Sequence, residues 1–262
     1  MLRIGALISG SGTNLTAIID GCKSRRIDGA VVFAGADNPS ASGLTKARTR
    51  GVETFVVDYR QIIDDISAGA LTAPEDFRLE ETAAKQRLFS GRTDPADMRR
   101  FLVSRAAAEA RLLDIIRPYS IDLMVLAGFM RTLTPYFIDR FSPDPLNPKI
   151  MNIPPALLPA FPGVDGYGDT WRYGCKVAGC TVHFIDYGED TGPIIAQRAF
   201  DIDEGSSIEV LREKGLQMEW ALYPHCIQLF AEGRLKVEET VFHLSSGKSC
   251  RRKRVRILPK KA

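Results

Sequence analysis

The sequence predicts an α/β protein whose mostly parallel, Rossmann-like sheet has helices on both faces. Short apolar stretches alternate with amphipathic ones in the first third of the chain, and one later stretch is almost continuously apolar. Alternating strands and helices favour a parallel sheet, and a strand that is covered on both faces shows little polar–apolar alternation. With 262 residues, of which 45% are hydrophobic, the chain is long enough to bury a large core.

Each expected element has its own signal in the residues. Strands are expected at the short apolar runs 3–9, 30–36, 53–57, 123–127, 150–153, 180–185 and 194–200. Helices are expected where apolar residues recur at helical spacing, at 14–22, 41–50, 95–117 and 206–230. Ser206 or Ser207 is expected to cap the last of these helices. The fold should therefore end with C-terminal strands and a long helix.

The chain is expected to comprise one functional domain, 1–237, with an insertion at 61–104 and a basic tail at 238–262. The insertion is rich in charge, contains Pro74 and Pro95, and is predicted to be partly helical. From position 248 onward there are eight basic residues and no acid, which leaves 27 basic against 32 acidic residues in the rest of the chain. We expect the tail to be a solvated, frayed end, with contact to nucleic acid or an acidic partner as the less favoured alternative.

The composition excludes several classes of protein. The longest strongly apolar run, 123–130, is far shorter than the roughly 20 residues that a membrane-spanning helix needs. The N-terminal residues show neither the apolar core nor the cleavage site of a secretory signal. The five cysteines match neither a compact disulfide framework nor a zinc site. We therefore expect a cytoplasmic protein with reduced thiols, no metal and no membrane partner.

Residues 9–14, Ser-Gly-Ser-Gly-Thr-Asn, stand between an expected strand and an expected helix. Glycines allow a tight turn that points several N–H groups at one spot, and the helix N-terminus adds partial positive charge. The segment lacks the third glycine of a dinucleotide fingerprint and the lysine of a Walker motif. It indicates a site for an anion such as phosphate, although an ordinary strand-to-helix turn has the same composition.

Three further segments combine polar groups with strand ends. Residues 126–131 (LAGFMR) follow the most apolar strand, and ligands of open α/β sheets bind outside the carboxyl ends of strands. Residues 152–163 are dense in proline and begin with Asn152, whose amide can donate to a carbonyl oxygen. His183 on a strand and Asp190 in a glycine-containing loop suit proton transfer. A lone histidine on an apolar strand is, however, more often a hydrogen-bonded core residue.

Together and in this order, the four motifs resemble the glycinamide ribonucleotide formyltransferase family of purine biosynthesis. The resemblance covers residues 1 to about 237 apart from the insertion. ISGSGTN is similar to the phosphate loop of the family, VLAGFMR to its folate-site strand, and NIPPALLPAFPG to its NIHPSLLP-type loop. DTGPII is similar to its catalytic aspartate loop, and EWALYP with GRLK to its C-terminal helix and turn. The resemblance implies the formyltransferase fold.

The resemblance also implies an activity, which is formyl transfer from 10-formyltetrahydrofolate to the amine of glycinamide ribonucleotide without a metal. It assigns substrate binding to Gly12, Thr13, Asn14 and Glu219. It assigns folate binding to Arg105, Met130, Arg131, Thr132, Leu133 and Asn152. Asn152 and Asp190 match two catalytic residues of the family, and His183 is the further catalytic candidate. The partners would be these two small molecules; nucleic acid is not expected, and a homodimer is left open.

One position departs from the family. The catalytic histidine of its asparagine-x-histidine motif is replaced here by Pro154, which can neither donate nor relay a proton. Residues 165–171 (DGYGDTW) also differ, where the family has a histidine-bearing stretch. We expect this segment to fill the space at position 154, and a rearranged proton relay to join Asp190 with Tyr167, Asp165, Asp169 or His183.

Two other functions stay open at this point. A related folate-dependent enzyme, such as a formyltetrahydrofolate deformylase or a nucleotide-sugar formyltransferase, would share most of these motifs. A non-catalytic folate- or nucleotide-binding protein would tolerate the loss of the histidine. Folate turnover with and without the nucleotide distinguishes the three.

Overall fold

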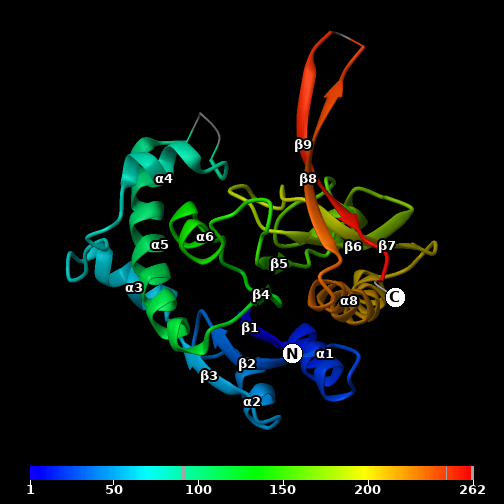
Figure 1. The fold of residues 1–262 in the computed structure, drawn as a ribbon, viewed down its shortest axis with the longest axis horizontal. Helices are drawn as coiled ribbons and strands as arrows, with labels where there is room; N and C mark the ends of the chain where they lie inside the picture. The colour runs from blue at the N-terminus through cyan, green and yellow to red at the C-terminus, as the bar shows by residue number, and fades with distance from the viewer. Residues whose placement is uncertain (90–92, 246, 261–262) are drawn as a thin grey trace.

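A computed structural model describes residues 1–89, 93–245 and 247–260. Its main sheet has seven strands in the order β3-β2-β1-β4-β5-β6-β7 (Figure 1). The strands are β1 (Leu2–Ile8), β2 (Gly29–Ala36), β3 (Glu53–Val56), β4 (Leu123–Leu126), β5 (Ile150–Asn152), β6 (Val177–Phe184) and β7 (Ile194–Asp201). The first five strands in this order are parallel, and β6 and β7 are antiparallel to their neighbours. The predicted fold class is confirmed, and a strand is present at every expected position.

Helices cover both faces of this sheet, because side chains along each strand point alternately to the two sides. Leu123 and Val125 of β4 pack on one core, to which α1, α2 and α8 contribute. Met124 and Leu126 pack on the other, to which α3, α5 and α6 contribute. The helices are α1 (Thr13–Lys23), α2 (Gly43–Arg48), α3 (Tyr59–Ser67), α4 (Leu79–Lys85), α5 (Pro95–Ile116), α6 (Pro135–Phe141), α7 (Gly166–Arg172) and α8 (Ile208–Ala231). A short 3₁₀ turn, Arg117–Tyr119, follows α5.

Several helix starts have the chemistry that their sequence predicts. Asp94 caps α5 by accepting a hydrogen bond from the N–H of Ala96, and Pro95 occupies the first helical position. Ser207, one of the two expected caps, accepts from Val210 at the start of α8. The sequence did not predict α6 or α7, which have seven residues each. Helices this short, set among prolines and glycines, carry too little periodicity to be recognised.

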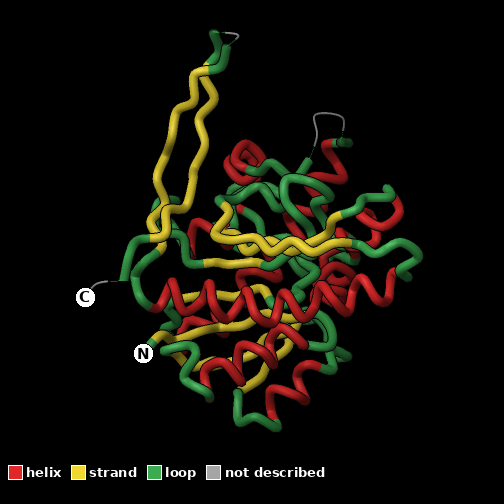
Figure 2. The backbone as a smooth tube through the Cα atoms, turned by 90° about the vertical axis from the view of Figure 1, so that its right-hand side faces the viewer, coloured by secondary structure: helices red, strands yellow, loops and turns green. Residues whose placement is uncertain are grey.

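The expectation of a frayed C-terminal tail is wrong. Strands β8 (Leu235–His243) and β9 (Ser249–Ile257) form an antiparallel β-hairpin, paired across nine positions. It projects from the body as a long ribbon (Figures 1 and 2). Apolar residues alternate with charged ones at its base, and Glu238 and Glu239 form ion pairs with Arg256 and Arg251, so the basic run extends as a strand. The expected boundary at 237 falls inside β8, and residues 261–262 of the expected tail lie outside the described residues.

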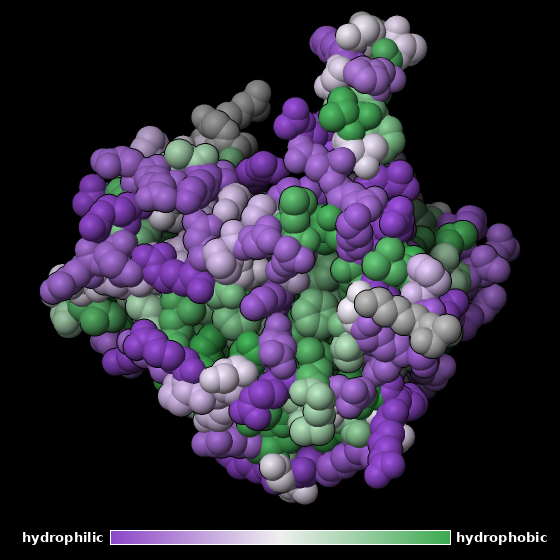
Figure 3. Space-filling view, viewed as in Figure 1, coloured by the Kyte–Doolittle hydropathy of each residue, from purple (hydrophilic) through white to green (hydrophobic). Residues whose placement is uncertain are grey.

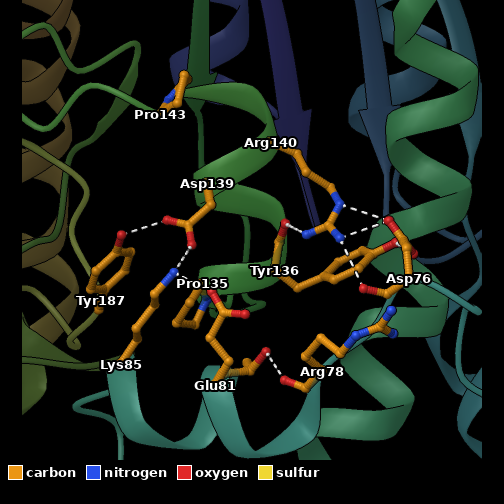
Figure 4. Close-up of a pocket in the computed structure, with 11 residues that line it drawn as sticks. Asp76, Arg78, Glu81, Lys85, Pro135, Tyr136, Asp139, Arg140, Pro143 and Tyr187 are labelled. Atoms are coloured by element: carbon orange, nitrogen blue, oxygen red, sulfur yellow. Dashed lines mark hydrogen bonds and ion pairs between the residues drawn. The ribbon is translucent and has the colours of Figure 1, made fainter.

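The expected insertion 61–104 contains most of α3, all of α4 and the first half of α5, while its residues 90–92 lie outside the described ones. Figure 4 shows how α4 is attached to the body. Asp139 of α6 accepts hydrogen bonds from Lys85 at 2.8 Å and from Tyr187 at 2.5 Å. Arg140 pairs with Asp76 at 2.7 Å. These charged groups pair with one another around the hollow that they line. The pairs hold the insertion against α6 and against the loop after β6.

Candidate active site

A pocket lies beyond the carboxyl ends of β4 and β5, where an open α/β sheet places its ligands. Its wall includes Gly128, Phe129, Met130, Arg131, Thr132, Leu133, Asn152, Pro154, Gly163, Ile185 and Asp190. The structure therefore brings the expected folate-binding stretch 130–133 together with Asn152 and Asp190. These residues come from three separate motifs that meet only in the folded chain.

Asn152 and His183 are direct neighbours across the antiparallel pair of β5 and β6. His183 is completely buried, and its Nδ1 lies 2.8 Å from the carbonyl oxygen of Phe184. Its Nε2 lies 3.4 Å from Oδ1 of Asp190. His183 is thus a buried, hydrogen-bonded core histidine, and it also faces the pocket aspartate.

Asp190 is held by donors on several sides. The N–H of Gly163 donates to its Oδ2 at 2.9 Å, and its own backbone adopts a left-handed conformation with φ of 53°. Burial alone would raise the pKa of this carboxyl, but His183, the Gly163 N–H and the Asn152 amide outweigh it and hold the pKa below its usual value. Asp190 is therefore a carboxylate at neutral pH.

The hydrogen bonds around His183 determine where its protons lie. A carbonyl oxygen can only accept, so Nδ1 carries a hydrogen that it donates to Phe184. Its Nε2 faces Oδ1 of Asp190 and has no hydrogen-bond partner among the described residues. The separation of 3.4 Å is longer than a normal hydrogen bond. The structure therefore brings the imidazole and the carboxylate close together without a hydrogen bond between them.

The segment 165–171 contributes no residue to the pocket wall, but at Gly166 it packs against Pro155 and Ala156, the residues that follow Pro154. Pro154 lines the pocket, and its carbonyl oxygen accepts from the N–H of Thr181 at 3.3 Å. Asp165 and Asp169 both form ion pairs with Arg172 on the outside of α7. Of the partners proposed for Asp190 from the sequence, His183 is the one that faces it.

Tyr167, the remaining candidate of that segment, belongs to a second cluster. Its hydroxyl donates to Oε1 of Glu219 at 2.9 Å, and the Asn14 amide donates to Oε2 at 2.6 Å. All three side chains are buried. Burial raises the pKa of Glu219, and the two donors offset part of this effect. The Oδ1 of Asn14 has no hydrogen-bond partner among the described residues, which leaves one free acceptor in the cluster.

The Asn14 cluster sits at the N-terminus of α1. Gly12 precedes the helix with φ of 66°, and a Cβ there would lie 2.9 Å from the Cα of Gly43. Gly12 thus supplies both the turn and the close approach of α1 to α2. Ser9 connects this turn to the pocket, because its Oγ accepts from the N–H of Met130 at 2.7 Å.

Arg105, the expected folate-binding arginine, lies behind the pocket wall. Its guanidinium stacks on the rings of Tyr59 and Phe101, at 5.2 and 4.8 Å from their centroids. Arg131 stacks on the same Tyr59 ring and pairs with Asp37 at 2.5 Å. Nε and Nη1 of Arg105 are buried without a hydrogen-bond partner among the described residues. A buried cation with two free donors is suited to an anionic group.

Sequence reasoning missed Glu109, which holds Thr134 at the end of the expected folate-binding stretch 130–133. Glu109 is fully buried and accepts from the N–H and the hydroxyl of Thr134, at 2.7 and 2.5 Å. The available signal was its spacing from Leu102, Arg105 and Leu112, which places this acid on the apolar face of α5. No sequence signal indicated that Tyr167 would reach Glu219.

The part of the chain that the structure describes contains neither a metal-binding cluster nor a membrane-spanning helix. Among residues 1–89, 93–245 and 247–260, no three His, Cys, Asp or Glu side chains are grouped to hold a metal ion. In the same residues no helix is both long and apolar enough to cross a membrane. All five cysteines are free thiols.

Comparisons with known proteins agree with this geometry. Residues 2–227 match the model of the formyl transferase family. The phosphoribosylglycinamide formyltransferase of Escherichia coli K12 is 32% identical over 238 residues, which are 91% of each chain. That of Bacillus subtilis 168 is 29% identical over 87% of this chain and 94% of its own. The solved structure of glycinamide ribonucleotide transformylase 1 from Symbiobacterium toebii is 38% identical, covers 99% of this chain and 95% of its own, and gives a TM-score of 0.72.

Proposed function

The chain belongs to the formyl transferase family, and on this premise we propose that it transfers the formyl group of 10-formyltetrahydrofolate to the amine of glycinamide ribonucleotide, in purine biosynthesis. One observation carries the proposal. Asn152 and Asp190 line the same pocket as the stretch 130–133, at the end of the sheet where ligands bind. Residues 1–237 are the formyltransferase domain in this proposal, with 61–104 as its insertion.

The reaction needs two kinds of assistance. The substrate amine attacks the formyl carbon, a new C–N bond forms, and a tetrahedral intermediate with a negative oxygen results. The bond to the folate nitrogen then breaks, and the proton of the amine ends on that nitrogen. In our proposal the Asn152 amide donates to the developing oxyanion, and a single donor of this kind is typically worth on the order of 10²–10³ in rate.

Asp190 is the base in this proposal, and His183 is its partner. The lowered pKa keeps Asp190 ionised, so that it can accept the amine proton directly or through water. His183 lies beside it, with 3.4 Å between Nε2 and Oδ1, and in our proposal this imidazole takes the place of a group at position 154 as the neighbour of the base. The proton relay of this chain thus runs through the strand neighbour of Asn152 instead of through position 154.

The nucleotide binds at the N-terminus of α1. Gly12, Thr13 and Asn14 present the turn and the first N–H groups of the helix, which suit a phosphate. Glu219 accepts from Asn14 and Tyr167, and the free Oδ1 of Asn14 remains to accept from a hydroxyl or amine of the substrate. The Ser9–Met130 hydrogen bond keeps this site adjacent to the folate pocket.

The residues present fit the folate co-substrate. The stretch 130–133 and Asn152 surround a partly apolar pocket for its ring system. The free donors of Arg105 suit the anionic end of the folate, with Arg131 beside it on Tyr59. We place the enzyme in the cytoplasm, consistent with its free thiols.

An absorbance assay of folate turnover tests the proposal. Purified protein is incubated with 10-formyltetrahydrofolate, with and without glycinamide ribonucleotide. We expect turnover only when the nucleotide is present. Turnover without it would identify a deformylase, and tight binding of both ligands without turnover would identify a binding protein.

A further inference from the structure

Asp37 is a buried acid beside the part of the pocket that is proposed to bind the anionic end of the folate. Hydrophilic residues cover much of the surface in Figure 3, and a charged side chain that water surrounds needs no special explanation. Asp37, in contrast, is 2% exposed. A carboxylate removed from water is costly unless it is paired and hydrogen-bonded, and its negative charge opposes the binding of another anion nearby. A function of Asp37 must outweigh both effects.

Three neighbours fix the position of Asp37. Its Oδ2 accepts from Nε of Arg131 at 2.5 Å, and its Oδ1 accepts from the amide of Asn38 at 2.9 Å. The carbonyl oxygen of Asp37 accepts from the N–H of Tyr59 at 3.0 Å. The Asn38 amide also donates to the carbonyl oxygen of Ser9 at 3.0 Å, which ties Asp37 to the turn before α1. The Nε of Arg131 therefore has a partner that is itself held in place.

Arg131 keeps its other donors for the pocket. It belongs to the pocket wall, and its side chain is 28% exposed. The hydrogen bond to Asp37 uses Nε, and neither Nη1 nor Nη2 of Arg131 donates to another described residue. The guanidinium also lies over the Tyr59 ring, 5.6 Å from its centroid. Because a guanidinium is planar, the bond at Nε and the contact with the ring together fix where the two terminal nitrogens lie.

The charges around Tyr59 leave room for one anion. Arg105 lies over the same ring as Arg131, at 5.2 Å from its centroid. Two acids, Asp37 and Glu109, act on Arg105, and burial raises the pKa of Glu109 to about 8, so that Glu109 is protonated at neutral pH. Two guanidinium groups and one ionised carboxylate leave one net positive charge. This charge balances one carboxylate of a ligand.

We propose that Asp37 is a positioning residue, which holds Arg131 so that its Nη1 and Nη2 pair with one carboxylate of the folate. The inference rests on the proposed function, because it concerns the folate of that reaction. A free arginine side chain loses rotamer freedom when it binds, and a side chain that is held in advance avoids this loss. Repulsion between Asp37 and the ligand is weak in comparison, because Arg131 already pairs with the negative charge of Asp37.

A positioning role and simple charge repulsion predict opposite effects of Asp37→Asn. Calorimetry measures the Kd of 5,8-dideazafolate, and of the same compound with an uncharged N-methylamide in place of its glutamate. The parent should bind the charged compound about tenfold or more tightly, because the amide lacks the hydrogen bonds of the carboxylate. The asparagine amide cannot accept from both Arg131 and Asn38, because one of its two ends is a donor.

Asp37→Asn should therefore reduce the preference for the charged compound by roughly three- to tenfold, as expected when one long side chain is no longer held in advance. The Kd of the uncharged compound and kcat should stay as in the parent. Charge repulsion alone predicts the reverse, which is tighter binding of the charged compound. An increased or unchanged preference would overturn the proposal.

Variants of Arg131 test the same contact from the other side. Arg131→Lys retains the charge, but an ammonium group that is held by Asp37 cannot also present a parallel pair of donors to the ligand. This variant should lose as much of the preference as Arg131→Ala. Asp37→Asn should have no further effect on the preference when residue 131 is alanine, because the two residues act as a unit. A lysine variant with the preference of the parent, or losses that add up, would contradict the positioning role.

Asp114→Asn is the matched control. Asp114 pairs with Arg117 at 2.7 Å on the exposed surface at the end of α5, and its substitution changes the net charge by the same amount. The preference of this variant should equal that of the parent. A parent that binds neither compound would remove the proposed function and this inference with it. A parent that binds both compounds equally would leave the proposed function standing and overturn the role of Asp37.

Discussion

Asp190 is the one carboxylate in the pocket that is surrounded by donors while its backbone is in a left-handed conformation. A residue without a Cβ would adopt this conformation more easily, so the position of the carboxylate is maintained at a cost of order 1–3 kcal/mol. Strained residues of this kind are common at reacting centres, where geometry matters more than stability. Asp190→Asn keeps the shape of the side chain and removes its charge. It therefore separates the proposed chemical role of the carboxylate from its part in the structure of the loop.

Asp190→Asn should lower kcat by roughly 10² or more, because an amide cannot accept the amine proton. The amide can still accept from the Gly163 N–H, so the loop should keep its place. Steady-state kinetics with both substrates measures the effect, and thermal unfolding checks the fold. Full activity in this variant would remove Asp190 from the mechanism.

Tyr167→Phe should raise the KM for the nucleotide about tenfold and leave the KM for folate unchanged. The variant removes one of the two donors that hold Glu219, and a hydrogen bond to a charged group contributes roughly 1.5–3 kcal/mol. Tyr173→Phe is the matched control, since Tyr173 is 80% exposed on the turn after α7. Equal KM values for the two variants would show that Tyr167 is only a packing residue.

At the scale of elements, α4 acts on the pocket through the loop after β6. Asp139 accepts from Lys85 of the insertion and from Tyr187, three residues before Asp190, while the N–H of Arg87 donates to the Tyr187 carbonyl at 2.8 Å. The insertion thus supports the loop that carries Asp190, the proposed base. This gives 61–104 a role that its charge-rich sequence did not indicate.

Asp139→Ala should destabilise both segments that Asp139 joins, the end of α4 at Lys85 and the loop at Tyr187. Amide hydrogen exchange in 79–89 and 185–191 is expected to quicken by a factor of about 2–10, which corresponds to the roughly 0.5–1.5 kcal/mol of one hydrogen bond. Glu81→Ala removes only an exposed helical ion pair with Lys85 and should change exchange little. If exchange in 185–191 stays as in the parent, the insertion does not support that loop.

The elements that sequence reasoning identified are those whose signal is local. β4 is recognised because Leu123, Met124, Val125 and Leu126 are all apolar, and α8 because Ser207 caps a long periodic segment. The β8–β9 ribbon was missed because its many basic residues leave few apolar positions from which a strand could be recognised. The apolar pair of Val237 and Val255 becomes apparent only when the two strands are paired. Asn152 and Asp190 were found through motifs, whereas the Tyr167–Glu219 contact joins positions 52 residues apart and depends on how α7 packs on α8.

For the molecule as a whole, the buried acid Glu109 links stability to pH. Burial raises its pKa to about 8, even though Thr134 donates to it twice. The folded chain therefore holds this proton more tightly than the unfolded chain, in which the carboxyl has its ordinary pKa. The stability that Glu109 contributes is fully present below pH 4.5, declines as the pH rises above that value, and is lost once the pH has passed about 8.

Glu109→Gln should abolish this part of the pH dependence. Glutamine imitates the protonated acid, since its oxygen can accept from the Thr134 N–H and its amide can donate to the Thr134 hydroxyl. Thermal unfolding of both proteins is measured between acid and mildly alkaline pH. The Tm of the variant relative to that of the parent should increase as the pH rises. A difference of 1 kcal/mol corresponds to a shift in Tm of roughly 2–4 °C for a chain of this size. Parallel curves would mean that Glu109 titrates normally.

The ladder between β5 and β6 has a consequence for how this protein can change. It sets Asn152 opposite His183 by strand register, so their distance does not depend on the length or composition of the connection between them. That connection can carry Pro154 and form α7 from the residues GYGDTWR while the amide and the imidazole stay together. A library of variants restricted to 164–176 should therefore alter the proposed acceptor site, through the contact of Tyr167 with Glu219, and leave the proposed reacting centre in place. Selection for a different amine substrate can begin there.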